Sequence, residues 1–338
     1  MIPHTDLQWQ TQTWQQELKD AIRCPVELLG FLGLEPDQAE LRALASQDFP
    51  MLVPRPFVDK MKRGDRYDPL LLQVLPSPEE LDRPAGDTND PLQEALKNPV
   101  PGLIHKYHGR VLLIAAPGCA VNCRYCFRRH FEYSTNSPSR SLWPETLSYI
   151  AADSSISEVI FSGGDPLLLN DSLLEEFIGR ISEIGHVRRL RIHTRLPVVI
   201  PARLTLQLGT LLAESRLQCV MVIHSNHANE INEELAQSLA KFARSGVTLL
   251  NQSVLLRGVN DSAEALEKLS EVLFSAGVMP YYLHLLDRVS GAAHFDVPRS
   301  RALEIYEELL GKCSGYLVPR LVRECPNTAS KIPLTPYT

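Results

Sequence analysis

From residue 110 onward, short apolar runs alternate with longer amphipathic segments, and this alternation constrains the fold more than any other feature. The longer segments space their apolar residues as helices do, and two of them end at Gly246 and Gly277, which are typical helix-stop residues. Six alternations of this kind predict parallel strands with helices packed outside them. The expected strands are 110–116, 157–164, 189–194, 218–225, 248–256 and 279–286, and the clearest helices are 172–185, 203–215, 232–246 and 262–277.

Polar residues at the ends of the expected strands favour one of two α/β architectures. Six units are too few for a complete barrel of eight, so a partial barrel and a doubly wound sheet both fit the alternation. In a barrel the C-terminal strand ends share one face, whereas a doubly wound sheet gathers ligand contacts at its switch point. Reactive side chains follow or lie along all six strands, namely Cys119–Cys126, Ser162–Pro166, His193 and Arg195, His224–His227, Gln252, and His284 and Asp287. We therefore predict a partial, TIM-like (β/α)6 barrel.

The first 100 residues differ from the rest and predict an N-terminal helical arm or cap. Short helical patterns occupy 14–22 and 25–34, whereas 75–91 is rich in proline and turn residues that break helices. A chain of 338 residues exceeds one average domain, but α/β barrels of roughly 200–250 residues fold as single units. We expect three parts, a helical extension at 1–100, a barrel at 101–312 and a C-terminal segment at 313–338.

The composition argues against several classes of protein. The formal net charge of −6 lacks the basic excess of a general nucleic-acid-binding surface. No run approaches the ~20 apolar residues of a membrane-spanning helix, and residues 1–20 lack the basic leader and apolar core of a signal peptide. The odd number of cysteines, seven, favours reduced thiols. We expect a soluble, cytoplasmic protein that binds neither nucleic acid nor membrane.

Three cysteines lie close together in the segment CAVNCRYC, residues 119–126, and no fourth follows nearby. A closed zinc site has four ligands, so zinc would need one from elsewhere, such as His130. Buried structural thiols are a second alternative, although Asn122 and Arg124 make the segment polar. Iron–sulfur clusters are held by thiolates, commonly four. Three thiolates on a [4Fe–4S] cluster would leave one iron open for an exogenous ligand, and we favour this interpretation.

The spacing of Cys119, Cys123 and Cys126, with an aromatic residue before the last, resembles the radical S-adenosylmethionine superfamily. The segment SGGDP at 162–166 matches the superfamily motif that holds the amino group of S-adenosylmethionine. Further segments resemble the lysine 2,3-aminomutase family across roughly residues 50–335, among them RYCFRRHF, RIHTRLPVVIP, HSNHANEI, NQSVLLRGVND and MPYYLHLLD. The resemblance implies a barrel of the radical S-adenosylmethionine type, with a mouth closed by the short C-terminal segment.

This resemblance also implies an isomerase that converts L-lysine to (R)-β-lysine. Its cofactors would be a [4Fe–4S] cluster, S-adenosylmethionine and pyridoxal phosphate, with an external electron donor for the cluster. Within the family the likeness is closest to the branch that supplies β-lysine for modification of elongation factor P. Membership of that branch would link the enzyme, through its product, to elongation factor P or to the ligase that modifies it. Three alternatives stay open: a free-lysine 2,3-aminomutase of catabolism or osmolyte synthesis, a radical enzyme without pyridoxal phosphate, and a non-catalytic iron–sulfur or zinc scaffold.

The family's cofactor-binding residues map onto individual positions of this sequence. The implied cluster ligands are Cys119, Cys123 and Cys126, and Lys331 stands where the family carries the lysine that binds pyridoxal phosphate. Lys106 stands where relatives often carry arginine. The other implied contacts are Arg110 and Tyr107 for pyridoxal phosphate, Ser162, Gly163, Gly164, Asp165, Arg195 and His224 for S-adenosylmethionine, and Gln252 between the two cofactors.

Three further residues are implied to hold the substrate. Arg128 matches the family residue that binds the substrate carboxylate, for which a guanidinium supplies two parallel donors. Asp287 and Glu324 match the two acids that hold the distal ammonium group of lysine. Glu324 stands where free-lysine enzymes carry an aspartate, so the negative charge is kept and its reach is longer by one methylene.

Overall fold

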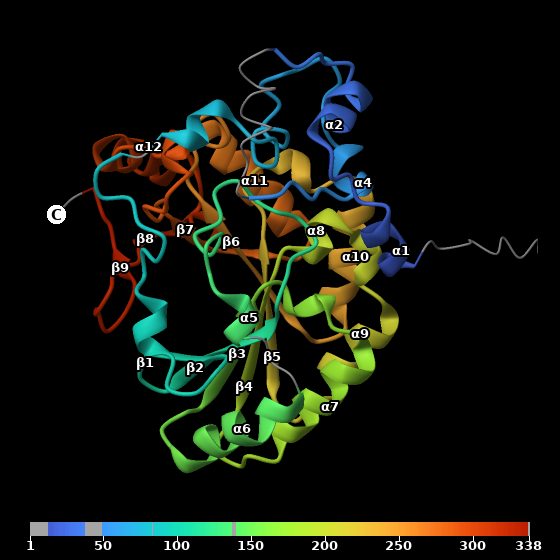
Figure 1. Ribbon diagram of the computed structural model, residues 1–338, viewed down its shortest axis with the longest axis vertical. Coiled ribbons are helices and arrows are strands. Elements are labelled where there is room, and N and C mark those ends of the chain that lie inside the picture. The colour runs from blue at the N-terminus through green and yellow to red at the C-terminus, as the bar shows by residue number, and fades with distance from the viewer. Residues whose placement is uncertain (1–12, 38–48, 83, 137–139, 337–338) are drawn as a thin grey trace, which may run out of the picture.

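The computed structural model of the protein describes residues 13–37, 49–82, 84–136 and 140–336 (Figure 1). Within these residues, nine strands form one sheet in the order of the chain, from β1 at one edge to β9 at the other. The strands are β1 (Leu103–Tyr107), β2 (Arg110–Ala116), β3 (Glu158–Gly163), β4 (Arg189–Thr194), β5 (Gln218–His224), β6 (Thr248–Val254), β7 (Met279–His284), β8 (Arg320–Arg323) and β9 (Ile332–Pro333).

Strands β2 to β8 pair in parallel, whereas the two edge pairs, β1–β2 and β8–β9, are antiparallel. The six strands predicted from the sequence correspond to β2 to β7 and are confirmed. The remaining strands include β8, of four residues, and β9, of two, which are too short to show an alternating pattern. The α/β class and the partial barrel are confirmed.

Helices cover the outer face of the sheet in Figure 1, and two of them begin and end as the sequence predicts. The side chains of Asn232 and Ser262 accept hydrogen bonds from the backbone N–H groups three residues on. Gly246 and Gly277 have positive φ angles just beyond the ends of these helices. The α-helices are α1 (Trp14–Lys19), α2 (Pro25–Phe31), α4 (Arg55–Val58), α5 (Tyr133–Asn136), α6 (Trp143–Ala152), α7 (Asp171–Ser182), α8 (Leu196–Val199), α9 (Leu206–Ala213), α10 (Glu233–Arg244), α11 (Ala263–Ser275) and α12 (Arg299–Lys312). None of the helices in the described ranges has both the length and the apolar character needed to cross a membrane.

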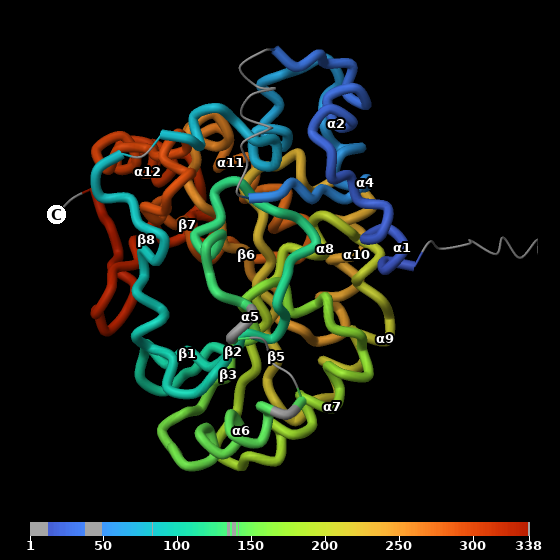
Figure 2. Tube along the Cα trace, viewed as in Figure 1, coloured from blue at the N-terminus to red at the C-terminus, as the bar shows by residue number. Residues whose placement is uncertain are grey.

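The sheet curves without closing through backbone hydrogen bonds, and side chains bridge its two ends instead. Strands β1 and β9 lie on the same side of the molecule, coloured teal and red in Figures 1 and 2. Lys106 and Tyr107 of β1 both bond to Glu324, the residue that follows β8. An ion pair therefore links the N-terminal edge of the sheet to its C-terminal end, across the opening of the partial barrel.

The N-terminal extension packs on the barrel and shares its core. Trp14, Leu28 and Phe57 belong to the same buried cluster as Phe161 of β3 and Met221 of β5. Helix α4 lies against α8, as Figure 1 shows in blue and yellow-green. The helical patterns predicted at 14–22 and 25–34 form α1 and α2, although each helix is shorter than its pattern. The first twelve residues lie outside the described ranges, and the boundaries at residues 100 and 312 stay predictions.

Candidate active site

A cavity of about 610 Å³ follows the inner face of the sheet and reaches the C-terminal ends of the strands. The site residues predicted from the sequence line this cavity, apart from Gly163. They are Tyr107, Arg110, Cys119, Cys123, Cys126, Arg128, Ser162, Gly164, Asp165, Arg195, His224, Gln252, Asp287, Glu324 and Lys331. The fold thus brings together residues that are separated by more than half of the chain.

Cys119, Cys123 and Cys126 lie in the loop after β2, and all three line the cavity. Burial is the largest cause of the raised pKa of Cys119 and of Cys126, whose pKa rises to about 11, and the neighbouring thiols add to it. In the part of the chain that the structure describes, no three His, Cys, Asp or Glu side chains converge on a single ion position. A [4Fe–4S] cluster needs no such convergence, because its ligands bind different irons. Three thiolates therefore fit a cluster better than zinc. His130, which could have supplied a fourth zinc ligand, contacts the Ser290 carbonyl at 3.2 Å instead.

The N-terminal extension holds the cysteine loop through one buried carboxylate. Glu80, on the 3₁₀ helix η1 (Pro78–Leu81), accepts hydrogen bonds from Arg124 Nε at 2.7 Å and from Arg129 Nη2 at 2.7 Å. The Arg124 side chain is fully buried, and its backbone N–H donates to the Gln73 carbonyl at 2.9 Å. No spacing in the sequence connects Glu80 with the cysteine motif, so only the fold identifies this contact.

The SGGDP segment ends β3 and supports the start of the cysteine loop by close backbone contact. A Cβ atom on Gly164 would lie 2.0 Å from the Gly118 carbonyl oxygen, so only glycine fits there. Gly163 has a φ of +103°, and a Cβ on it would approach Ile114 of β2 to 2.6 Å. The Asp165 N–H donates to the Gly118 carbonyl at 2.7 Å. Gly164 is therefore required by the packing of the loop against β3, and Gly163 by its positive φ and its close approach to β2, whatever ligand the loop holds.

Asp165 is buried, and its carboxylate fixes the turn after the next strand. It accepts hydrogen bonds from Thr194 Oγ1 at 2.7 Å, from the Arg195 N–H at 2.7 Å and from the Leu196 N–H at 2.8 Å. These bonds set the conformation between β4 and α8 and so direct the Arg195 side chain. Asp165 also lines the cavity, but its oxygens already hold this turn. Its role toward S-adenosylmethionine stays a prediction.

The Arg195 guanidinium lies between the cysteine loop and the N-terminal extension. Its Nη1 donates to Cys123 Sγ at 3.0 Å, and its Nη2 donates to Gln73 Oε1 at 2.9 Å. Its Nε is buried without a hydrogen-bond partner among the described residues. A buried donor left in this state costs about 1–3 kcal/mol. An anionic group bound in the cavity would satisfy it, and the carboxylate of S-adenosylmethionine has the chemistry required.

His224, at the end of β5, is held by the aromatic residue of the cysteine motif. The Tyr125 hydroxyl lies 3.1 Å from His224 Nε2, and the two rings stack with centroids 5.6 Å apart. Burial, assisted by the charge of Arg195, lowers the pKa of His224 to about 3. The imidazole is therefore neutral near pH 7 and can contribute a hydrogen bond to the cavity but no charge. Gln252 lies beside it in the β5–β6 register.

Arg128 is buried and already forms a two-pronged ion pair. Its Nε and Nη2 donate to the Glu94 carboxylate at 2.7 and 2.9 Å, and its Nη1 donates to Ser162 Oγ at 3.1 Å. Glu94 begins the 3₁₀ helix η2 (Glu94–Lys97) of the N-terminal extension. A guanidinium has five N–H donors, so two remain, one on each terminal nitrogen. Arg128 can therefore still receive a second carboxylate without releasing Glu94.

Lys331 contacts Glu324 at the opposite end of the sheet from β1. Strands β8 and β9 pair Arg323 with Ile332, and the next position in the same antiparallel register brings Glu324 beside Lys331. Their side chains form an ion pair, and the Tyr107 hydroxyl donates to Glu324 at 3.0 Å. Burial alone would raise the pKa of Glu324, but the ammonium groups of Lys331 and Lys106 hold it well below its usual value. Glu324 is ionised at neutral pH.

The β1–β2 hairpin places two further predicted cofactor contacts side by side. Tyr107 pairs with Arg110 across the hairpin, and the Arg110 guanidinium lies 4.6 Å from the centre of the Tyr107 ring. Arg110 lines the cavity, and no carboxylate of the described residues forms an ion pair with it. A guanidinium in this setting suits a phosphate group, because it offers paired N–H donors and a fixed positive charge.

Comparison with known proteins identifies close relatives along almost the whole chain. A family model described as the radical SAM superfamily matches residues 113–269. An L-lysine 2,3-aminomutase of Haemophilus influenzae is 50% identical over 331 residues, which are 98% of each chain. Another, of Escherichia coli, is 51% identical over 324 residues, 96% of this chain and 94% of the relative. A radical SAM methyltransferase structure from Sphaerobacter thermophilus superposes with a TM-score of 0.46 and 19% identity, over 65% of this chain and 68% of that one.

Proposed function

Because the chain belongs to the L-lysine 2,3-aminomutase family of radical S-adenosylmethionine enzymes, it is an isomerase, and we propose that it converts L-lysine to (R)-β-lysine. Family membership implies a [4Fe–4S] cluster, S-adenosylmethionine and pyridoxal phosphate. When bound, these groups supply a deoxyadenosyl radical and an electron-accepting ring that carries the migrating nitrogen. The protein's own task is to place lysine between them.

The observation that carries this proposal is the distribution of charge along one cavity. Arg128 lies toward the cysteine loop with two N–H donors to spare, whereas Asp287 and Glu324 supply carboxyl groups near Lys331. L-Lysine has a carboxylate at one end and an ammonium group at the other, so it is complementary to this arrangement. An amino acid with an acidic side chain would instead face two carboxyl groups.

Dependence on pyridoxal phosphate is part of the proposal and rests on Lys331. The amino group of Lys331 lines the cavity, and the Arg110–Tyr107 pair of the adjoining hairpin offers a site for the phosphate. Lys106 adds a second cation beside Glu324. With Lys331 engaged by the cofactor, Glu324 would keep Lys106 as a partner and still present a negative charge to the substrate.

The direct test is the product formed by purified, anaerobic protein with a reconstituted and reduced cluster. With L-lysine, S-adenosylmethionine and pyridoxal phosphate we expect (R)-β-lysine, detected by chiral chromatography and mass spectrometry. Omission of pyridoxal phosphate from protein stripped of it should abolish the product. Formation of β-glutamate from glutamate, with no reaction of lysine, would refute the substrate assignment.

A second prediction concerns pH and follows from Asp287. Burial and the charge of Glu324 raise the pKa of Asp287 to about 7, with a smaller contribution from Glu94, while Lys331 and Lys106 oppose the rise. The ε-ammonium of lysine, with a pKa near 10.4, stays charged over this range. As the pH falls below this pKa, Asp287 becomes neutral and attracts the ammonium group less. With Lys331 engaged by the cofactor one opposing charge is lost and the transition moves upward, so KM for lysine should fall about tenfold as the pH rises through a range that begins near pH 7.

The control for this prediction is Asp287→Asn, which removes the titrating group with little change in size. The variant should show a high KM for lysine that no longer falls as the pH rises through this transition. Steady-state kinetics at saturating S-adenosylmethionine measures both enzymes. A variant that retained the pH dependence of the unaltered enzyme would show that another group is responsible.

We further propose that the β-lysine modifies elongation factor P in the cytoplasm. The support is the resemblance to that branch of the family and the glutamate at position 324 where free-lysine enzymes carry an aspartate. All seven cysteines are free in the structure, as suits a reducing compartment. Adding elongation factor P and its ligase to the product assay should transfer label from lysine to the factor. Failure of transfer, with free (R)-β-lysine accumulating, would favour the free-lysine role.

A further inference from the structure

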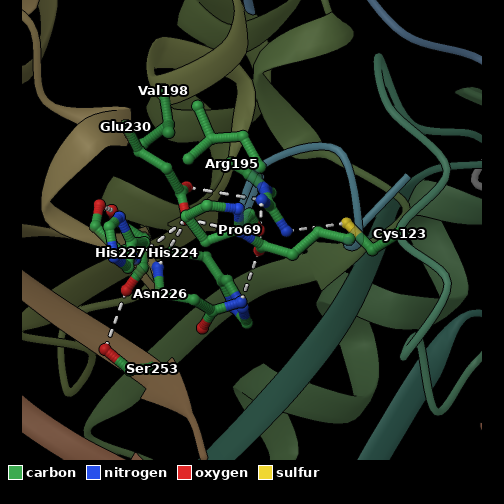
Figure 3. Close-up of polar contacts among 12 residues, drawn as sticks. Pro69, Cys123, Arg195, Val198, His224, Asn226, His227, Glu230 and Ser253 are labelled. Atoms are coloured by element: carbon green, nitrogen blue, oxygen red, sulfur yellow. Dashed lines mark hydrogen bonds and ion pairs between the residues drawn. The ribbon is translucent and has the colours of Figure 1, made fainter. Parts of the chain in front are cut away.

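A buried polar network connects the N-terminal extension to the cysteine loop through Arg195. In Figure 3 the Arg195 side chain lies between Cys123 on one side and Glu230 on the other. Besides the bond to Cys123 Sγ, its Nη2 donates to Gln73 Oε1 at 2.9 Å and to Glu230 Oε2 at 3.3 Å. The Gln73 and Glu230 side chains are fully buried. With both N–H groups of Nη2 engaged, the guanidinium cannot turn away from Cys123 without breaking these bonds.

The acceptors that hold Arg195 are themselves fixed. Glu230 ends the 3₁₀ helix η6 (Ala228–Glu230), and its Oε1 accepts from the backbone N–H groups of Asn226 at 2.9 Å and His227 at 3.0 Å. Gln73 Nε2 donates to the same oxygen at 3.1 Å. Lys60 Nζ donates to the Glu230 carbonyl at 2.9 Å. With three donors on Oε1 and its backbone held by Lys60, the Glu230 carboxylate is preorganised, so it imposes its position on Arg195.

We propose that Glu230 and Gln73 are positioning residues that hold Arg195 against Cys123 and thereby raise the reduction potential of the cluster bound by that cysteine. A hydrogen bond donated to a ligating sulfur draws electron density from the iron, so it favours the reduced cluster. Neither Glu230 nor Gln73 reaches the reacting atoms. The inference rests on the cluster site of the proposed function, but it does not depend on the identity of the substrate.

The charges in this network explain why a glutamate and a glutamine act together. A buried guanidinium needs a nearby anion, because leaving it unpaired in a low-dielectric interior is costly. Glu230 supplies this anion on the side away from the cysteine loop, whereas Gln73 accepts a hydrogen bond without adding charge. Arg195 can therefore be held firmly while only one carboxylate is added to the surroundings of a cluster that must accept an electron.

The test measures the midpoint potential of the reconstituted cluster by a redox titration followed by electron paramagnetic resonance, without S-adenosylmethionine or lysine. Gln73→Leu removes an acceptor of Arg195 and leaves the charge unchanged. Glu230→Asp keeps the charge but shortens its reach. Both variants should shift the potential to more negative values. Arg195→Lys should do the same, because a single nitrogen replaces the two terminal nitrogens that reach Cys123 on one side and Gln73 and Glu230 on the other.

Matched controls come from the neighbouring helix α10. Gln237→Leu and Glu233→Asp make the same chemical changes at exposed positions and should leave the potential unchanged. Iron content and thermal unfolding report whether each variant folds and holds its cluster, and Glu230→Asp carries the test if Gln73→Leu does not fold. An unchanged or less negative potential in variants with full iron content would overturn the proposal. Aminomutase activity does not enter this readout, so such a result would leave the proposed function standing.

Discussion

Replacing Lys331 with alanine is expected to lower β-lysine formation by about ten thousandfold or more, as removal of a covalent catalytic group does in other enzymes. Without Lys331, pyridoxal phosphate would lose its covalent attachment in the cavity. The substrate, L-lysine, would then lose the site at which it joins the cofactor. The purified variant should also lack the visible absorbance of pyridoxal phosphate bound to a lysine. Product assays and absorbance spectra on the same preparation measure both effects.

A suitable control for Lys331→Ala is Lys312→Ala. Lys312 lies at the end of α12 and pairs with Glu264 at the surface, so its removal should cost little stability and no activity. The cluster should remain in both variants, because the ion pair between Lys331 and Glu324 does not contact the cysteine loop. Retention of both the absorbance and the product in Lys331→Ala would place the cofactor on another residue.

The second large effect is expected at the cysteines. Changing any one of Cys119, Cys123 or Cys126 to alanine should remove most of the bound iron and reduce both deoxyadenosine release and β-lysine formation to background. With two thiolates left, the cluster loses one of its three protein ligands, and no other source of the radical exists in the proposed reaction. Iron analysis, electron paramagnetic resonance of the reduced protein and a deoxyadenosine assay provide independent measurements.

Cys313→Ala provides the matching control. Cys313 follows α12, is only partly buried and does not line the cavity, so its loss should leave iron content and activity unchanged. If a variant of the three cluster cysteines kept a full cluster, a side chain from elsewhere would have to ligate it. That result would remove the open iron on which the binding of S-adenosylmethionine depends.

Much of the architecture follows from local sequence pattern. Strands β2 to β7 and the helix ends at Gly246 and Gly277 are predicted correctly, because apolar periodicity and helix-stop glycines are properties of short segments. The residues that gather in the cavity are also predictable, since the C-terminal ends of parallel strands in a barrel share one face. The edge strands β1 and β9 are missed, because hairpin pairing at an edge leaves a weak periodic signal.

The hydrogen-bond and ion-pair partners of the predicted site residues could not be predicted from the sequence. Glu80, Glu94 and Gln73 come from the N-terminal extension, where no motif or spacing marks them, yet each bonds to an arginine at or beside the cysteine loop. Glu230 follows the fourth predicted strand, and nothing in the sequence distinguishes it from an ordinary acidic residue of a turn. Such contacts depend on how distant segments pack, and no local pattern in a single sequence identifies them.

By itself, the sequence determined the class of fold, the position of the cysteine motif and the residues available for chemistry, because each of these is encoded in periodicity, spacing or residue type. Only the tertiary structure decided which of those residues are already paired. It shows Arg128 held by Glu94, Lys331 by Glu324, and Arg195 fixed between Cys123 and Glu230. The physical reason is that a buried charge must find a partner wherever the packed chain supplies one, and that partner need not be near in sequence.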